Sequence, residues 1–90
     1  MSVTVSIPTI LRSHTGGEKC VSASGYTLGA VIGDLEAKYS GIFDRLIDDD
    51  KPYRFVNIYV NDEDVRFSGG LDTAVADGDS VTILFAMAGG

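Results

Sequence analysis

Residues 27–39 decide the fold of this chain, and they read TLGAVIGDLEAKY. Thr27 belongs to the residue types that cap helix N-termini, and Gly41 to those that end helices. Between them, the apolar side chains fall on one stripe of a helix: Leu28, Val31, Ile32, Leu35 and Tyr39. The segment therefore predicts one amphipathic helix over about 27–39, with its apolar face directed at a core.

Strand patterns precede this helix. Val3–Ile7 alternates apolar and polar residues, which is the period of a half-buried strand, and Pro8 ends it. Residues 19–23 predict a short return strand, and Gly16 and Gly17 suit the turn between the two. We therefore expect an N-terminal hairpin.

Strand patterns also follow the helix. Three strands are expected there, at residues 55–60, 65–67 and 80–84. Turns, some of them helical, are expected at 43–46, 61–64, 71–75 and 77–79. One helix can cover one face of a four- or five-stranded sheet, so the predicted class is α+β, with the first and last strands at the buried centre.

Length and charge narrow the function. The chain has 90 residues, which suits one domain, and its formal net charge is −6. That charge has the wrong sign for nucleic-acid binding. Acidic residues gather at 48–50, at 62–64, and at Asp77 and Asp79. They either form a solvated surface or draw the domain to a basic protein surface.

Targeting signals are not evident in the sequence. The N-terminus lacks the basic start and apolar run of a signal peptide, and no apolar stretch has the length of a membrane span. Cys20 is the only cysteine, so no internal disulfide is possible. We expect a cytoplasmic protein that binds neither nucleic acid nor membrane.

The C-terminus carries the functional prediction. Residues 85–90 read FAMAGG and have little side chain to offset the roughly 1–2 kcal/mol that ordering each backbone residue costs. We therefore expect a domain at 1–84 and a flexible tail at 85–90. Such a tail can enter a narrow channel in a partner protein, where Ala88 and Gly89 give access and Gly90 presents its carboxylate. A glycine-rich end without function is the alternative.

Several segments resemble one family. The turn and strand at 77–84, followed by a short apolar link and the terminal Ala88-Gly89-Gly90, resemble the ubiquitin-like sulfur carriers of the MoaD/ThiS family. Residues 56–66 look like the middle strand and turn of that family. Residues 3–12, with the Thr15-Gly16-Gly17 turn behind them, resemble its CysO-type branch, which serves cysteine biosynthesis. The likeness covers nearly the whole chain and is weakest from Phe43 to Tyr53.

The resemblance implies a fold and a chemistry. The fold is a β-grasp with a mixed sheet, and the chain is a carrier rather than an enzyme. An E1-like enzyme uses ATP to adenylate Gly90, and sulfur then converts the carboxylate to a thiocarboxylate. No cofactor is bound stably by the carrier. The small subunit of molybdopterin synthase and a ubiquitin-like modifier conjugated through Gly90 remain alternatives.

The resemblance also implies partners. They are the E1-like enzyme, a pyridoxal-phosphate-dependent cysteine synthase or another sulfur acceptor, and a JAMM-type metallopeptidase that releases the product. By analogy, the partner-binding residues are Leu84, Phe85, Met87 and Val65. Phe85 stands where the family commonly has proline, which leaves the choice of partner open. For Phe85 and Met87 we favour anchoring in a partner groove over a loose clasp on the sheet.

Other reactive residues receive no functional role. Cys20 is expected to be an ordinary strand residue, because only Lys19 lies near it in sequence to lower the pKa of its thiol. His14 is the only histidine and lies in a predicted turn. The acidic clusters lack the spacing of a calcium loop. We therefore predict no catalytic residue and no metal site.

Overall fold

A computed structural model describes residues 2–48, 51–53 and 55–85. Its main sheet has five strands in the order β2-β1-β7-β5-β6. The strands are β1 (Val3–Ser6), β2 (Cys20–Ala23), β5 (Val56–Val60), β6 (Glu63–Asp64) and β7 (Ser80–Phe85). β1 and β7 run parallel and the other pairs run antiparallel, so the sheet is mixed, as predicted.

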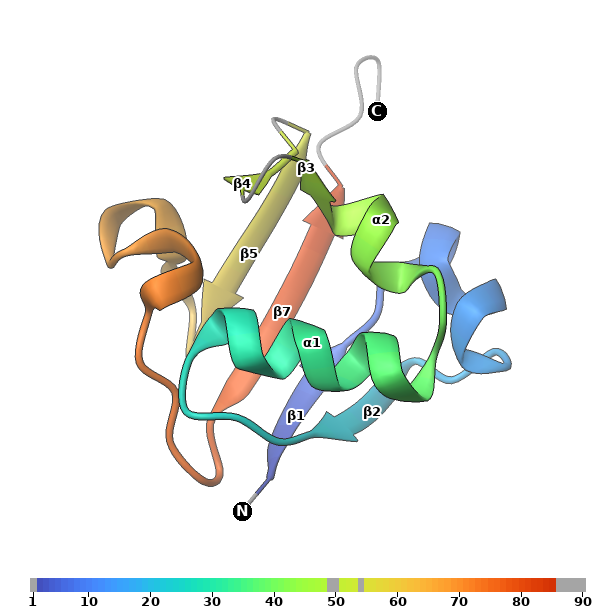
Figure 1. The fold of residues 1–90 in the computed structure, drawn as a ribbon, viewed down its shortest axis with the longest axis horizontal. Coiled ribbons are helices and arrows are strands. Elements are labelled where there is room, and N and C mark those ends of the chain that lie inside the picture. The colour runs from blue at the N-terminus through green and yellow to red at the C-terminus, as the bar shows by residue number, and fades with distance from the viewer. Residues whose placement is uncertain (1, 49–50, 54, 86–90) are drawn as a thin grey trace.

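Helices cover one face of this sheet (Figure 1). The main helix, α1 (Leu28–Lys38), lies within the predicted segment, and the Thr27 hydroxyl accepts a hydrogen bond from the Ala30 amide at 3.2 Å. A short helix, α2 (Ile42–Leu46), follows it. The Glu36 carboxylate joins the two helices, because it accepts hydrogen bonds from the amides of Gly41 and Phe43. The Gly41 backbone, with φ of 97°, makes the turn between them.

The core lies between α1 and the sheet. Side chains alternate along each strand, so that one set enters the core and the other faces away. The first and last strands supply its centre, as predicted, because β7 is the middle strand and β1 is its neighbour. The most deeply buried side chains include Val5, Leu28, Val31, Ile32, Leu35, Ile58, Val81 and Ile83.

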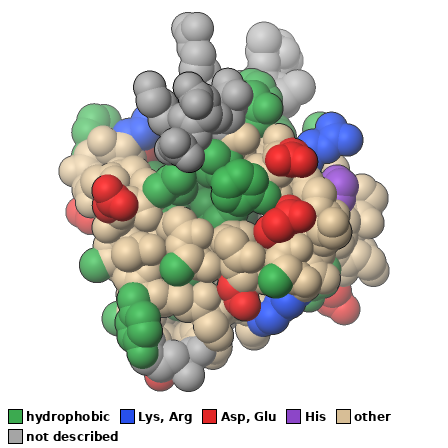
Figure 2. Space-filling model, in the orientation of Figure 1, with side chains coloured by type: hydrophobic (Ala, Val, Ile, Leu, Met, Phe, Trp, Pro, Cys, Tyr) green, Lys and Arg blue, Asp and Glu red, His purple; other side chains and the backbone are tan. Residues whose placement is uncertain are grey.

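The remaining elements are short. Three 3-10 helices are present: η1 (Thr9–Thr15), η2 (Val65–Phe67) and η3 (Gly70–Asp72). A second sheet is the two-stranded ladder of β3 (Ile47–Asp48) and β4 (Lys51–Pro52). This ladder and η1 were not predicted. Figure 2 shows hydrophobic side chains gathered near the centre of the helix-covered face, with acidic side chains beside them.

Two predictions about strands are corrected. Residues 65–67 form η2 rather than a strand, since the Asp64 side chain caps that turn by accepting from the Arg66 amide at 2.9 Å. β6 ends there after two residues. The last strand continues through Phe85 rather than ending at Leu84, because Phe85 pairs with Val56 in the ladder between β5 and β7.

Turn residues behave as predicted. Gly16, Gly17 and Gly78 all have positive φ, with Gly78 at 87°. Asn61 and Asp62 also have positive φ, at 50° and 72°, which carries the chain from β5 into β6. Asn and Asp tolerate this conformation better than most residues. The turn after β5 and the turn before β7 are therefore set by local sequence.

Candidate functional site

Strand direction brings three chain segments to one end of the sheet. Because β1 and β7 are parallel, their C-terminal ends lie at the same end of the sheet. β2 begins at that end, since it runs antiparallel to β1 and its Cys20 pairs with Ser6. β7 continues from there towards the C-terminus. The predicted reacting residue Gly90, the access residues Gly89 and Ala88, and Met87 lie outside the described residues.

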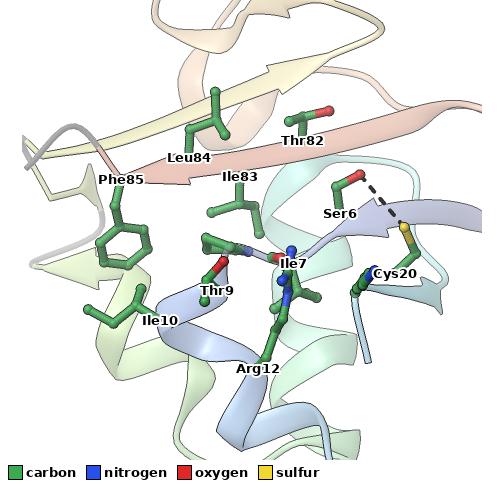
Figure 3. Close-up of a pocket in the computed structure, with 12 residues that line it drawn as sticks. Ser6, Ile7, Thr9, Ile10, Arg12, Cys20, Thr82, Ile83, Leu84 and Phe85 are labelled. Carbon is green, nitrogen blue, oxygen red and sulfur yellow. Dashed lines mark hydrogen bonds between the residues drawn. The ribbon is translucent and has the colours of Figure 1, made fainter. Parts of the chain in front are cut away.

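Side chains alternate at the end of β7. Ile83 is buried, whereas Leu84 keeps 49% of its surface exposed on the uncovered face of the sheet. Figure 3 shows Leu84 and Thr82 pointing away from the side taken by Ile83 and Phe85. Leu84 is therefore accessible to a partner, and its role in binding one stays a prediction.

Phe85 belongs to an aromatic cluster, in which its ring is tilted by 43° against that of Phe55. Its ring lies 5.7 Å from that of Phe55, measured between centroids, and Phe55 stacks on Tyr53 at 5.0 Å. Such pairs add stability beyond the apolar area they bury. Phe85 thus packs within the domain as the clasp that the sequence analysis ranked second, rather than belonging to a free tail. Its partly exposed ring still forms part of the surface from which the C-terminal residues continue.

Val65 does not belong to the exposed site. The structure buries it at 1% exposure in the core, so the prediction that its side chain contacts a partner is wrong for this conformation. The cause is η2, which turns Val65 inward and leaves the neighbouring Phe67 at 87% exposure. A strand at 65–67 would have given a different alternation of side chains.

An open groove crosses this end of the sheet (Figure 3). Its volume is about 510 Å³. Phe85 and Ile10 point towards one another at one end, and Arg12 and Cys20 lie towards the other. The lining comes from β1, η1, β2 and β7: Ser6, Ile7, Pro8, Thr9, Ile10, Arg12, Lys19, Cys20, Thr82, Ile83, Leu84 and Phe85.

Two basic side chains make one end of the groove positive. Arg12 Nε donates a hydrogen bond to the Ile7 carbonyl at 3.1 Å, which holds the guanidinium against the end of β1. Across the described part of the chain, neither Arg12 nor Lys19 has a carboxylate within 4.0 Å. This end of the groove therefore combines apolar surface with cationic groups that have no anionic partner there.

A different basic side chain, Arg66 on the uncovered face, has its charge paired. Arg66 lies 3.0 Å from the Asp64 carboxylate and donates to Asn57 Oδ1 at 2.6 Å. The hydrogen bond from Arg66 lowers the pKa of Asp64. Asn57 pairs with Leu84 in the ladder, so this charge network borders the exposed Leu84.

Sequence reasoning missed Arg12, Lys19, Ile10 and Phe55 as site residues. Only Ile10 carried a weak signal, as a large apolar residue just after the strand-ending Pro8. Arg12 and Lys19 come near β7 because strands about 60 to 80 residues apart in sequence pair with one another. Phe55 comes near it through the contact between its ring and that of Phe85. No local periodicity reports such contacts.

The other reactive residues receive no chemical role, although Cys20 lines the groove. Cys20 is exposed, with its Sγ 4.0 Å from Ser6 Oγ. A Cβ added at Gly41 would lie 3.4 Å from the His14 ring, so His14 packs against the turn between α1 and α2. In residues 2–48, 51–53 and 55–85, no three His, Cys, Asp or Glu side chains are grouped as metal ligands. Nor does any helix there have the length and apolarity to cross a membrane.

Comparisons with known proteins identify similar chains. The family model described as ThiS matches residues 5–90. The chain is 77% identical to the sulfur carrier protein CysO of Mycobacterium tuberculosis over 93 aligned positions, covering all of both proteins. The crystal structure of that CysO matches with a TM-score of 0.91, covering 94% of this chain and 99% of that one.

Two further relatives match over most of the chain. The Amycolatopsis orientalis BexX/CysO complex contains a chain that is 62% identical, with a TM-score of 0.94, covering 98% of this chain and 99% of that one. Small archaeal modifier protein 3 of Haloferax volcanii is 41% identical over 64 residues, which is 71% of this chain and 70% of that protein. The matched region of the ThiS model includes the last residue, Gly90.

Proposed function

This chain belongs to the ThiS family, and on that premise we propose that it is a sulfur carrier whose C-terminal Gly90 carboxylate becomes a thiocarboxylate. The observation that carries the proposal is the full-length similarity to sulfur carrier protein CysO, together with a family match that runs to residue 90. The fold fits this role, since the central strand β7 leads to the C-terminal residues at an accessible end of the sheet.

The proposed chemistry uses one group of this chain. An E1-like enzyme binds ATP, and a Gly90 carboxylate oxygen attacks its α-phosphorus, so that pyrophosphate leaves and an acyl-adenylate forms. A sulfur nucleophile then attacks the acyl carbon and AMP leaves with the carboxylate oxygen. Glycine at 89 and alanine at 88 have little or no side chain, so this C-terminal segment is thin enough to enter a narrow channel of the enzyme. Leu84, Phe85 and Met87 contribute apolar surface to the partner interface. The carrier supplies no catalytic residue and binds no cofactor stably.

The proposed pathway is the synthesis of cysteine or a related thio-metabolite. In it, a pyridoxal-phosphate-dependent cysteine synthase or another acceptor enzyme takes the sulfur, and a JAMM-type metallopeptidase frees the carrier. The similarity to a CysO chain that forms a complex with BexX supports a protein partner for this domain. We assign the protein to the cytoplasm, where ATP and these enzymes would be available.

Intact-mass spectrometry tests the proposal. The protein is incubated with ATP, a sulfur source and the E1-like enzyme of the same cell. We expect a mass gain that matches exchange of one oxygen for one sulfur, and fragmentation should place it at Gly90. Deletion of Gly89-Gly90 should abolish the gain while leaving the melting temperature unchanged, because both residues follow the described domain. Leu11→Met is a control that leaves the tail intact.

Two results would overturn the proposal, and a third would contradict the site that it assigns. One is the absence of any gain with every candidate activating enzyme while the protein remains folded. The other is normal sulfur transfer by the protein that lacks Gly89-Gly90. Addition of a whole sulfur atom at Cys20 would also contradict the assignment, since it would show that a side-chain thiol carries the sulfur as a persulfide.

A protein modifier is the second candidate. The 41% identity to small archaeal modifier protein 3 favours it, although over a shorter region than the similarity to CysO. In that case Gly90 would form an isopeptide bond with lysine amines of other proteins. Proteomic analysis of cell extracts would reveal lysines that carry a C-terminal fragment of this chain, which is residues 67–90 after trypsin because Arg66 is the last basic residue. These conjugates would disappear from cells without the carrier.

A further inference from the structure

We infer that the groove at the end of β7 docks an acidic side chain carried on an apolar segment of the activating enzyme, with Arg12 as its main contact. This inference rests on the proposed function and adds the chemistry of the docking surface. The groove lies beside the root of the C-terminal residues, since Leu84 and Phe85 line it. A segment bound there would sit next to the residues that must enter the enzyme.

Charge is distributed unevenly over the described surface. The chain is acidic overall, with a net charge of −6. Among the basic side chains that the structure describes, Lys38 and Arg66 are in ion pairs. Arg12, Lys19 and Arg45 have no ion pair with described residues, and all three line the groove or the smaller pocket next to it, which shares Ile10 and Phe85.

Arg12 is oriented for a carboxylate. Its Nε is held by the Ile7 carbonyl, and its terminal nitrogens have no hydrogen-bond partner among the described residues. A fixed guanidinium suits a carboxylate better than a lysine ammonium does, because its fork of N–H groups matches two carboxylate oxygens. A basic site on an acidic domain also selects against neutral or basic partner segments.

The apolar part of the groove defines the rest of the segment. Ile10 is 58% exposed at the end of the groove where Phe85 is partly exposed, whereas Leu84, which is 49% exposed, points to the opposite face of β7 (Figure 3). An apolar side chain near the acidic one would cover this surface and exclude water from the ion pair, which strengthens it. The expected partner segment therefore has Asp or Glu adjacent to a large apolar residue.

Binding and kinetics of single variants test the inference. The affinity of the full-length carrier for the E1-like enzyme is measured by calorimetry without ATP, and KM and kcat are measured for adenylation. Loss of an interfacial charge contact should weaken binding and raise KM roughly 5- to 10-fold in Arg12→Ala, with kcat unchanged. Arg12→Lys should recover less than half of this loss on a logarithmic scale, since it keeps the charge but not the fork. Lys19→Ala should have an effect of about twofold.

Lys38→Ala is the matched control. It removes one positive charge, but Lys38 belongs to α1 and pairs with Asp34 at 3.1 Å, away from the groove lining. Its KM should stay within about twofold of the wild type. The wild-type KM should also rise between about 0.01 and 0.15 M salt, because the Debye length falls from roughly 30 to 8 Å, and Arg12→Ala should lose most of that dependence. Melting temperatures check that each variant is folded.

Each outcome decides the inference. Equal KM and affinity for Arg12→Ala and Lys38→Ala would overturn it, as would a fall in kcat without a change in KM. A change in the NMR signals of Gly90 in free Arg12→Ala would show that the C-terminal carboxylate of this chain occupies the groove instead. If the wild type binds the enzyme but gains no sulfur, the proposed function fails while the affinities still decide the docking surface. A wild type that does not bind would overturn both.

Discussion

The two ends of β7 differ in how their polar groups are satisfied. At the start, the Asp77 carboxylate accepts from the Ser2 amide at 2.7 Å, and the Gly78 amide donates to the Ser2 carbonyl at 2.9 Å. Asn61 accepts from the Ser80 amide at 2.9 Å. At the other end, Arg12 and Lys19 have no carboxylate partner among the described residues, and Ile10 and Leu84 are exposed.

Residues at one end of β7 therefore serve the stability of the domain, and residues at the other end are available for binding. The start of β7 is closed by hydrogen bonds within the domain, which ties the N-terminal strand to the turn at 77–79. The end of β7 keeps apolar and cationic groups that have no partner among the described residues and that we propose to be covered in a complex. Changes at the start should therefore affect stability, and changes at the end should affect binding.

The largest expected effect on stability concerns the buried part of β7. Ile83→Ala should lower the free energy of unfolding by roughly 2–5 kcal/mol, because it leaves a cavity in a fully buried position. Leu84→Ala, one residue on, should cost no more than about 1 kcal/mol, since half of Leu84 is already exposed. Urea denaturation at pH 7 measures both. Similar losses for the two variants would contradict the alternation seen at this end.

The next effect tests the hydrogen-bonded start. Gly78→Ala should destabilise the domain by roughly 1–2 kcal/mol, because Gly78 has φ of 87° and a side chain there is strained even though nothing lies within 4 Å. Gly33→Ala is the matched control, since Gly33 is in the exposed interior of α1 with open space around it. It should stabilise by up to about 1 kcal/mol. Thermal unfolding checks the opposite signs, and equal signs would refute the conformational argument.

Acid should weaken the same end. The Asn61 side chain and the Ala76 amide lower the pKa of Asp79 below its usual 3.8. A lowered folded-state pKa contributes stability above the unfolded pKa, and that contribution disappears as the pH falls through the folded value. The free energy of unfolding of the wild type should therefore decrease as the pH is lowered below about 4. In Asp79→Asn it should decrease less steeply. Urea midpoints from neutral pH to pH 3 measure this.

Asn61→Ala provides the complementary measurement. It removes the first of the two groups that lower the pKa of Asp79, so that this pKa should move towards its usual value in an NMR titration. If the urea midpoints of the wild type and Asp79→Asn fall identically at acidic pH, the Asp79 carboxylate contributes nothing to stability at the start of β7. Asp34, Glu36 and Asp64 also have lowered pKa values, so part of the acid loss should remain in both variants.

The smallest effect tests the groove end. Ile10→Ser should change the free energy of unfolding by no more than roughly 0.5 kcal/mol, because Ile10 is 58% exposed. Its neighbour Leu11 is 2% exposed, and Leu11→Ser should be strongly destabilising. Denaturant titration of both variants gives the comparison. A large loss in Ile10→Ser would show that the groove end supports the fold as well as offering a binding surface.

Local sequence determined most of the elements. The helix over 27–39, the strands at both termini and the turn at 77–79 were predictable, because periodicity and turn chemistry act within a few residues of the chain. The family resemblance directed attention to Gly90. The strand predicted at 65–67 failed because the Asp64 side chain captures the Arg66 amide, which local strand propensity does not report.

Which side chains meet at the end of β7 follows from the packing of the whole domain. Local patterns were enough to predict an α+β domain with one main helix, a net charge of −6 and a terminal Gly89-Gly90. The parallel pairing of β1 with β7 then placed Arg12 and Leu84 on the lining of one groove, although 72 residues separate them. The same packing buried Val65 and brought the ring of Phe85 against that of Phe55. These contacts depend on strand order and register, which arise from burying the whole core at once and are absent from any local pattern.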